Sequence, residues 1–310
     1  MKRTVRLGLM TAALVGGIAV LPRTLVDAQG TGGVFFSEGW ESGTASSSFN
    51  SRYYGSAVGP QFRAQNIIRA GGNWALEHHM LQGLQPPAIQ YATQHFGDAV
   101  SGPVHSVGQG QRFDDLFVQY KVYYPDGFDF SARGYKQLII GTEDDRRHEN
   151  VCCNPWVSSY ITIYPAHPSR EPLVAEANNK QSPTSQWVGF YQNSSGYSSS
   201  NLFRIQTNRW YTIEVRRRLN DTGVDNGIFQ MWINGILIAD HRTVRFRVPW
   251  NGTYGSNFNY GTNFAMISDY TMEAVTRDQS IYYDDIKFGT SYIGMDVTAP
   301  SPPTNVRITR

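Results

Sequence analysis

Residues 210–240, WYTIEVRRRLNDTGVDNGIFQMWINGILIAD, decide the fold of this chain. Apolar and polar residues alternate in three segments of this stretch, which is the period of half-buried β-strands. The three segments are 210–219, 228–233 and 236–240. A run rich in Asn, Asp and Gly separates the first two and favours a loop, and Asn234-Gly235 is a typical two-residue hairpin turn. The stretch therefore predicts three consecutive antiparallel strands.

The same two-residue period recurs in the rest of the chain, and hardly any stretch has a helical period. Further strands are expected at 116–124, 135–141, 159–164, 187–192, 263–268 and 281–288. No repeat of fixed length occurs, which disfavours a propeller. We therefore expect an all-β fold, a two-sheet antiparallel β-sandwich of the jelly-roll kind.

The composition narrows the possible partners. The chain has 27 Lys and Arg against 25 Asp and Glu, and a net charge of +2 is too small for a surface that follows phosphates, so nucleic acid is not an expected partner. Tyr, Trp and Phe make up 13% of the chain. Aromatic rings pack on strands and also stack on sugar faces, so we expect most of them in the core and the rest to serve a glycan.

The first 28 residues have the features of an export signal. Lys2 and Arg3 precede an apolar run over 7–20, and Val26-Asp27-Ala28 offers a small-residue cleavage site. The apolar run is too short for a stable membrane anchor. We therefore predict a secreted or extracytoplasmic protein, with residues 29–292 as its β-sandwich domain. We expect this protein to be a monomer.

Two further segments leave alternatives open. Residues 293–310 are proline-rich and are predicted to be a linker, although they also resemble the start of a fibronectin type III module. Cys152 and Cys153 are adjacent, so no disulfide framework exists. Adjacent Cα atoms lie about 3.8 Å apart, less than the usual disulfide span, and both a vicinal bond and two thiols remain possible.

Three stretches carry a family resemblance: 210–240, 122–141 (VYYPDGFDFSARGYKQLIIG) and 281–289 (IYYDDIKFG). Together they resemble the concanavalin A-like lectin/glucanase superfamily, and within it the alginate and glucuronan types of polysaccharide lyase, over roughly residues 34–290. The resemblance implies a concanavalin A-like jelly roll that cleaves a uronic-acid-containing glycan by β-elimination. The paired-carboxylate strand of retaining glucanases is missing, which disfavours hydrolysis. The Gln-Ile-His and Tyr-x-Lys-x-Tyr signatures of one large alginate lyase family are missing too, so a lyase here would belong to another branch.

Two non-catalytic functions stay open beside the lyase. One is a carbohydrate-binding module, and the other is a structural or adhesive β-sandwich at the cell surface. These alternatives differ in what they predict, because only the lyase releases unsaturated products.

Strand alternation identifies candidate site residues on the faces of the strands that do not look like core. β-Elimination needs a group that neutralises the uronate carboxylate, together with a base and an acid. The catalytic candidates are Tyr160, Tyr164, Arg216, Lys121 and His78, and the substrate-binding candidates are Gln119, Tyr123, Glu214, Gln230 and Trp232. Such a face lines the concave sugar cleft in the jelly rolls that this chain resembles. An ordinary solvated face with cross-strand Glu–Arg pairs explains Glu214 and Arg216 equally well.

Four acidic residues near the two ends of the domain are candidate calcium ligands. Glu38 and Glu41 lie in FFSEGWESG, and Asp284 and Asp285 lie in IYYDDIKFG. Calcium prefers hard oxygen ligands, and the resemblance implies that the first and last strands bring such acids together around a structural Ca²⁺. The alternative is that the acids pair with nearby Lys or Arg side chains. No organic cofactor is expected.

Overall fold

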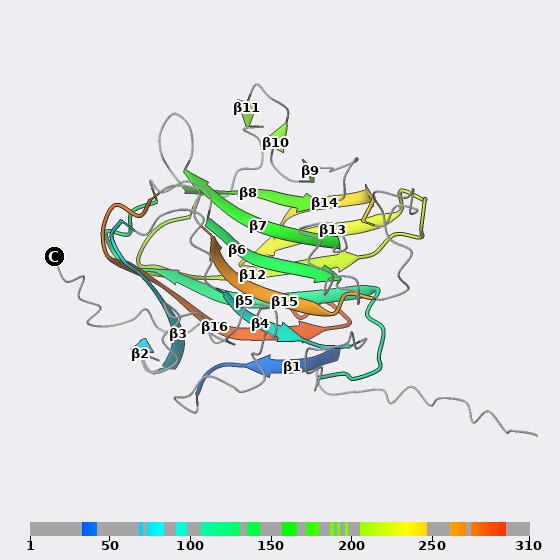
Figure 1. Ribbon diagram of the computed structural model, residues 1–310, viewed down its shortest axis with the longest axis horizontal. Helices are drawn as coiled ribbons and strands as arrows, with labels where there is room; N and C mark the ends of the chain where they lie inside the picture. The colour runs from blue at the N-terminus through cyan, green and yellow to red at the C-terminus, as the bar shows by residue number, and fades with distance from the viewer. Residues whose placement is uncertain are drawn as a thin grey trace, which may run out of the picture.

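The architecture is a β-sandwich of two antiparallel sheets (Figure 1). The computed structural model describes residues 33–41, 68–70, 73–83, 91–97, 107–130, 135–142, 157–165, 172–179, 187–188, 191–192, 196–197, 205–246, 261–270 and 274–295. Every named element in these ranges is a β-strand, which confirms the predicted all-β class. Within them, no helix is long and apolar enough to cross a membrane. The predicted export signal, the two cysteines and residues 296–310 lie outside the described residues.

The larger sheet has eight strands in the order β14-β13-β12-β5-β16-β3-β2, and β1 pairs with β16 beside this path. The strands, in sheet order, are β14 (Ile236–Val244), β13 (Gly227–Ile233), β12 (Arg209–Arg218), β5 (Asp115–Tyr124), β16 (Gln279–Gly289), β3 (Asn73–Met80), β2 (Ile68–Ala70) and β1 (Val34–Glu38). The three predicted strands of residues 210–240 are neighbours at one end of this sheet. Asn234 and Gly235 both have positive φ, 49° and 75°, as the predicted hairpin turn requires.

The smaller sheet has six strands in the order β4-β15-β6-β7-β8-β9. They are β4 (Tyr91–His95), β15 (Phe264–Tyr270), β6 (Tyr135–Thr142), β7 (Val157–Pro165), β8 (Pro172–Asn179) and β9 (Trp187–Val188). The expected single strand over 187–192 is wrong: β9 ends at Val188, and β10 (Tyr191–Gln192) pairs instead with β11 (Gly196–Tyr197). Alternation over so short a run cannot tell one strand from two strands that pair with different partners.

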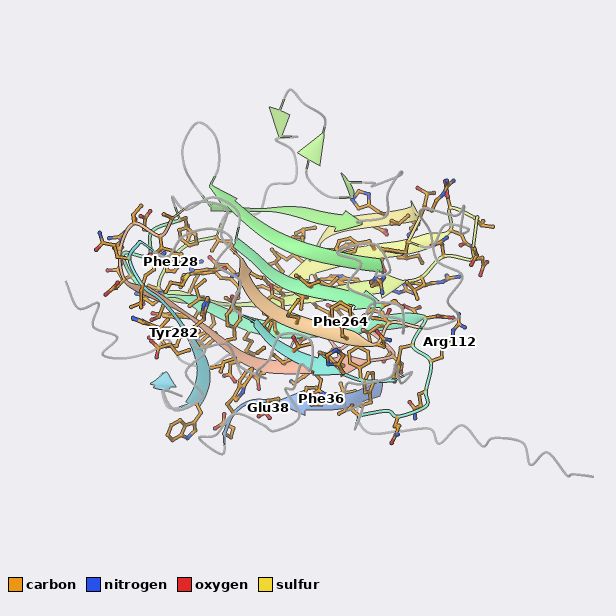
Figure 2. The ribbon with its side chains drawn as sticks, in the orientation of Figure 1. Phe36, Glu38, Arg112, Phe128, Phe264 and Tyr282 are labelled. Carbon is orange, nitrogen blue, oxygen red and sulfur yellow. The ribbon has the colours of Figure 1, made fainter. Side chains whose placement is uncertain are left out.

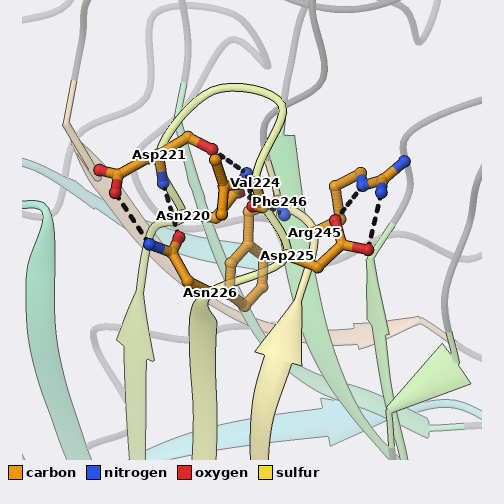
Figure 3. Close-up of polar contacts among 7 residues, drawn as sticks. All are labelled: Asn220, Asp221, Val224, Asp225, Asn226, Arg245 and Phe246. Carbon is orange, nitrogen blue, oxygen red and sulfur yellow. Dashed lines mark hydrogen bonds and ion pairs between the residues drawn. The ribbon is translucent and has the colours of Figure 1, made fainter.

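The loop between β12 and β13 is held by its own side chains (Figure 3). The Asn220 amide donates to the carbonyls of Asp221 and Val224, at 2.8 and 2.9 Å, while its oxygen accepts the Phe246 amide at 2.7 Å. Asp221 and Asn226 exchange two further hydrogen bonds of 2.9 and 2.8 Å. Short Asn and Asp side chains bond nearby backbone groups readily, which explains why this run interrupts the strand pattern.

The hydrophobic core fills the space between the sheets. It joins inner-face residues of both, among them Val118, Tyr120 and Val122 of β5, Ile213 and Val215 of β12, Leu138 and Ile140 of β6, and Ala265 and Ile267 of β15. One fully buried cation, Arg217, also points inward and donates to the Thr262 hydroxyl at 2.6 Å. Its guanidinium lies 5.0 Å from the centre of the Phe246 ring, so aromatic packing and hydrogen bonding offset the cost of burying it.

Candidate functional site

Each sheet turns a second face away from the core, and the two outer faces are the candidate sites. We call the outer face of the eight-stranded sheet the β5 face. It holds seven of the predicted site residues: Gln119, Lys121, Tyr123, Glu214, Arg216, Gln230 and Trp232. Cross-strand register makes neighbours of several, with Glu214 opposite both Gln119 and Trp232, and Arg216 opposite Gln230.

Tyr160 and Tyr164 are not on the β5 face, because β7 belongs to the other sheet. Tyr160 is the register partner of Ile139. Ile139 packs with Phe264 and Met266 in a cluster separate from the main core, so the tyrosine's position belongs to the outer face of the six-stranded sheet, which we call the β7 face. The expectation that these tyrosines share a cleft with Arg216 is therefore wrong. Alternation assigns a residue to one side of its strand but does not say which sheet that strand joins.

The histidine expectation also needs correction. His78 is fully buried and lies opposite Ile281, a member of the core, so it faces inward and does not reach the β5 face. Its neighbour His79 lies on that face instead, with Nδ1 3.0 Å from the Ser280 hydroxyl oxygen. The Ser280 hydroxyl in turn donates to Glu77 at 2.7 Å. Successive residues of β3 point to opposite faces, so of these two histidines it is His79 that lies on the β5 face.

The polar groups of the β5 face are largely engaged with one another. The Arg216 guanidinium donates to both carboxylate oxygens of Asp115, at 2.9 and 2.6 Å, and to Gln230 at 3.1 Å. The paired Asp115 carboxylate raises the pKa of Arg216. Gln230 donates onward to Asp240 at 3.0 Å, and the Tyr123 hydroxyl donates to Asn208 at 2.8 Å. The guanidinium predicted to neutralise a substrate carboxylate already binds a carboxylate of this chain.

Residues Tyr292–Met295, which we call the strap, lie across part of the β5 face. The amides of Ile293 and Gly294 donate to the Glu214 carboxylate at 2.8 and 3.0 Å. Gln119 donates to the same carboxylate at 3.0 Å and to the Gly294 carbonyl at 2.6 Å. Glu214 is 2% exposed, and this burial raises its pKa. The strap therefore occupies two of the side chains that were expected to bind substrate.

The four predicted calcium ligands meet where β1 joins β16, near the end of β1 at which Figure 2 labels Glu38. A Cβ placed on Gly39 would lie 3.3 Å from Asp285 Oδ1, 3.7 Å from Glu41 Cγ and 3.8 Å from Asp284 Oδ1. Three of the acids already accept protein donors. Glu38 accepts the Trp40 amide at 2.7 Å, Asp284 accepts the Asp285 amide at 2.7 Å, and Asp285 forms an ion pair with Lys121.

As they stand, these acids do not fit a calcium site. Among the described residues, no group of three or more His, Cys, Asp or Glu side chains is arranged to hold a metal ion. Asp284 is 1% exposed, and its Oδ2 has no hydrogen-bond partner. Burial, together with the charges of Asp285 and Glu41, raises the pKa of Asp284 to about 8, although Lys121 opposes this shift. Lys121 is the counter-ion of Asp285 and is only 4% exposed. Because its ammonium is both paired and buried, it is not available to bind a substrate.

The β7 face groups a different set of chemically useful residues. Tyr160 lies between the register positions of Ile139 and Asn178, and Lys136 is the register partner of Thr162 beyond a register shift between Lys136 and Leu138. Where β4 and β15 meet, His95 is buried with its ring 6.1 Å from that of Phe264, which Figure 2 labels. Lys136, Asn178 and His95 were missed by the sequence reasoning. These residues become neighbours only through the pairing of strands, which the sequence does not reveal. In addition, β8, which carries Asn178, has too few apolar residues to be recognised as a strand.

No family model matches this chain, and no curated protein matches it. Solved structures with a related shape include the following three. The alginate lyase Aly36B has 15% identity and a TM-score of 0.48 over 86% of this chain and 100% of its own. The endo-β-1,4-glucuronan lyase from the fungus Trichoderma reesei has 12% identity and a TM-score of 0.47 over 83% of this chain and 95% of its own. The globular domain of T. cruzi calreticulin has 9% identity and a TM-score of 0.43 over 84% of this chain and 88% of its own. These values describe likeness of shape alone.

Proposed function

We propose that this chain is a secreted glycan-active protein that cleaves a uronic-acid polysaccharide by β-elimination on its β7 face. One observation carries this choice: strand register brings Tyr160, Lys136, Thr162 and Asn178 together on the neighbouring strands β6, β7 and β8. A phenol, an ammonium and an amide are the kinds of group that this reaction uses. The β5 face is less suitable because its own ion pairs and the strap engage its polar groups.

The reaction assigns a task to each kind of group. A base removes the proton on the carbon beside the uronate carboxylate, the bond from the neighbouring carbon to the glycosidic oxygen breaks, and a double bond forms between the two carbons. An acid returns a proton to the leaving oxygen. In this proposal Tyr160 handles the protons, while Lys136 and Asn178 stabilise the negative charge that develops on the carboxylate in the transition state.

The test is to incubate the purified chain with alginate, glucuronan, pectate and heparin-type polymers and to follow the ultraviolet absorbance of the new double bond. We expect an increase on one of these polymers, and we expect Tyr160→Phe and Lys136→Gln to lower the rate at least tenfold while both variants stay folded. Arg216→Gln is the matched control on the opposite face and should keep its rate. Loss of the rate in Arg216→Gln alone would move the site to the β5 face.

A second candidate is a non-catalytic carbohydrate-binding module, and one observation favours it. On the β5 face the rings of Trp232 and Tyr292 lie 5.0 Å apart between centroids, and Tyr292 is 44% exposed. Exposed aromatic rings stack well on sugars. This alternative predicts that the polysaccharide retains the chain without releasing any product, and that Tyr292→Ala abolishes this retention.

A further inference from the structure

Lys121 lies at the centre of an acidic junction formed by three strands. It is on β5, where its register partner on β16 is Asp284, and its ammonium forms an ion pair with Asp285. The register between β5 and β16 shifts between Asp284 and Lys287, and Asp285 has a positive φ of 46°. In a regular strand two consecutive side chains point to opposite faces, whereas a bulge re-aims one of them. The bulge thus brings both carboxylates to one ammonium.

A third strand adds more negative charge to the same place. β1 pairs with β16, with Glu38 opposite Ile286, and the chain then turns at Gly39 so that Glu41 approaches the two aspartates. The Lys121 ammonium forms an ion pair with Asp285 at this junction. Asp284 is 1% exposed, and its buried Oδ2 has no hydrogen-bond partner. A buried carboxyl group is stable in its ionised form only when a cation compensates its charge.

We propose that Lys121 is the resident cation of this junction and makes the wild-type fold independent of a metal, and that a neutral residue of similar size at 121 would create a site for a divalent cation such as Ca²⁺. The ammonium and a metal ion would compete for the same oxygens, because Ca²⁺ also prefers hard carboxylate ligands. Asp285, with 29% of its side chain exposed, leaves a route for the ion from solvent.

The experiment measures thermal unfolding of the full chain in EDTA and in Ca²⁺. We expect the Tm of wild type to be the same in both. Lys121→Met should lower the Tm in EDTA by about 10 °C, because removing the buried partner of a partly exposed pair leaves the acidic cluster without its counter-ion. Ca²⁺ should restore most of this loss, and calorimetry should show one bound ion in the variant and none in wild type.

Two control variants locate the effect. Lys121→Arg keeps the positive charge and should remain insensitive to Ca²⁺. Arg242→Gln removes an exposed cation that pairs with Asp240 elsewhere in the same sheet, and should neither lose much stability nor respond to Ca²⁺. Adding Asp284→Asn to Lys121→Met should abolish the recovery.

Two results would overturn the proposal. One is a wild-type chain whose Tm rises in Ca²⁺, because the cation would then bind beside Lys121 and not in its place. The other is a folded Lys121→Met variant that loses stability and gains none of it back in Ca²⁺. If Lys121→Met does not fold in either buffer, the Tm of wild type in EDTA and in Ca²⁺ still tests whether the fold is independent of a metal. Lys121→Gln then replaces Lys121→Met in the test of Ca²⁺ binding.

Discussion

Tyr160 and Arg216 lie on opposite outer faces of the sandwich, with the core between them. Tyr160 is opposite Ile139 in the six-stranded sheet, whereas Arg216 is opposite Phe117 and Gln230 in the eight-stranded sheet. We expect Arg216→Gln to lower the free energy of unfolding by about 1 kcal/mol, since the half-buried pair with Asp115 is lost, without changing any glycan cleavage. Urea unfolding and the ultraviolet assay on the same preparation check both parts.

The neighbouring residues Arg217 and Arg218 should respond very differently to truncation. Arg217 is fully buried against Phe246 and bonded to Thr262, whereas Arg218 is exposed. Arg217→Ala should cost about 2–5 kcal/mol, because it leaves a cavity and unpaired polar atoms, and Arg218→Ala should stay within about 0.5 kcal/mol of wild type. Urea denaturation of the two variants measures the difference. Equal losses would show that the inward position of Arg217 is wrong.

Gly141 allows the Phe264 ring to lie over β6. A Cβ at this position would come within 2.2 Å of two ring carbons. Gly141→Ala should therefore cost about 1–3 kcal/mol through overpacking. Phe264→Leu removes part of the ring, so the double variant should be less destabilised than the sum of the two single variants. A strictly additive cycle would argue against this contact.

The buried carboxyl of Asp284 predicts a pH dependence of stability. Its pKa in the folded chain is raised from 3.8 to about 8, so the folded state binds this proton more tightly than the unfolded state does. The contribution of Asp284 to stability therefore falls as the pH rises from about 4 to about 8. Asp285, Glu41 and Lys121 are the charges that face it.

Asp284→Asn isolates this effect, since an amide is neutral at every pH. Relative to wild type, the variant should gain roughly 2–4 kcal/mol in free energy of unfolding between pH 5 and pH 8. Urea titrations of both proteins at the two pH values provide the measurement. A stability difference that does not change with pH would mean that Asp284 is charged throughout.

The Glu214 carboxylate holds the strap in place. Glu214→Ala removes the acceptor of the Ile293 and Gly294 amides, so hydrogen exchange at both amides should accelerate at least tenfold. Glu214→Gln keeps one oxygen acceptor and should have an intermediate effect. Unchanged protection in Glu214→Ala would mean that the ring contact between Tyr292 and Trp232 is sufficient to hold the strap.

Local sequence signals predicted the parts of the fold that depend on local chemistry. The alternation in residues 210–240 gave β12, β13 and β14, and the Asn-Gly pair gave their hairpin, since turn type depends on two adjacent residues. The strand β8, PLVAEANN, escaped prediction because its few apolar residues do not form a clear two-residue period.

The candidate site was harder to predict because it depends on which strands become neighbours. Alternation correctly grouped Gln119, Glu214 and Trp232 on one side of their strands, but it could not reveal that Tyr160 lies in the other sheet. Alternation also could not predict the strap, because its hydrogen bonds to Glu214 join positions about 80 residues apart. Pairing at such separations is decided by the whole core.

The position of β16 bears on how the chain reaches its native state. This last strand of the described sandwich hydrogen-bonds to β5, β3 and β1. Until residues 279–289 have been synthesised, β1 therefore lacks its sheet partner, and β5 and β3 each have one unpaired edge. Loop-closure entropy makes such long-range pairing slow. A nascent chain stalled before Gln279 would therefore expose unpaired strand edges, and the domain should become protease-resistant only in a late, concerted step after those residues are available.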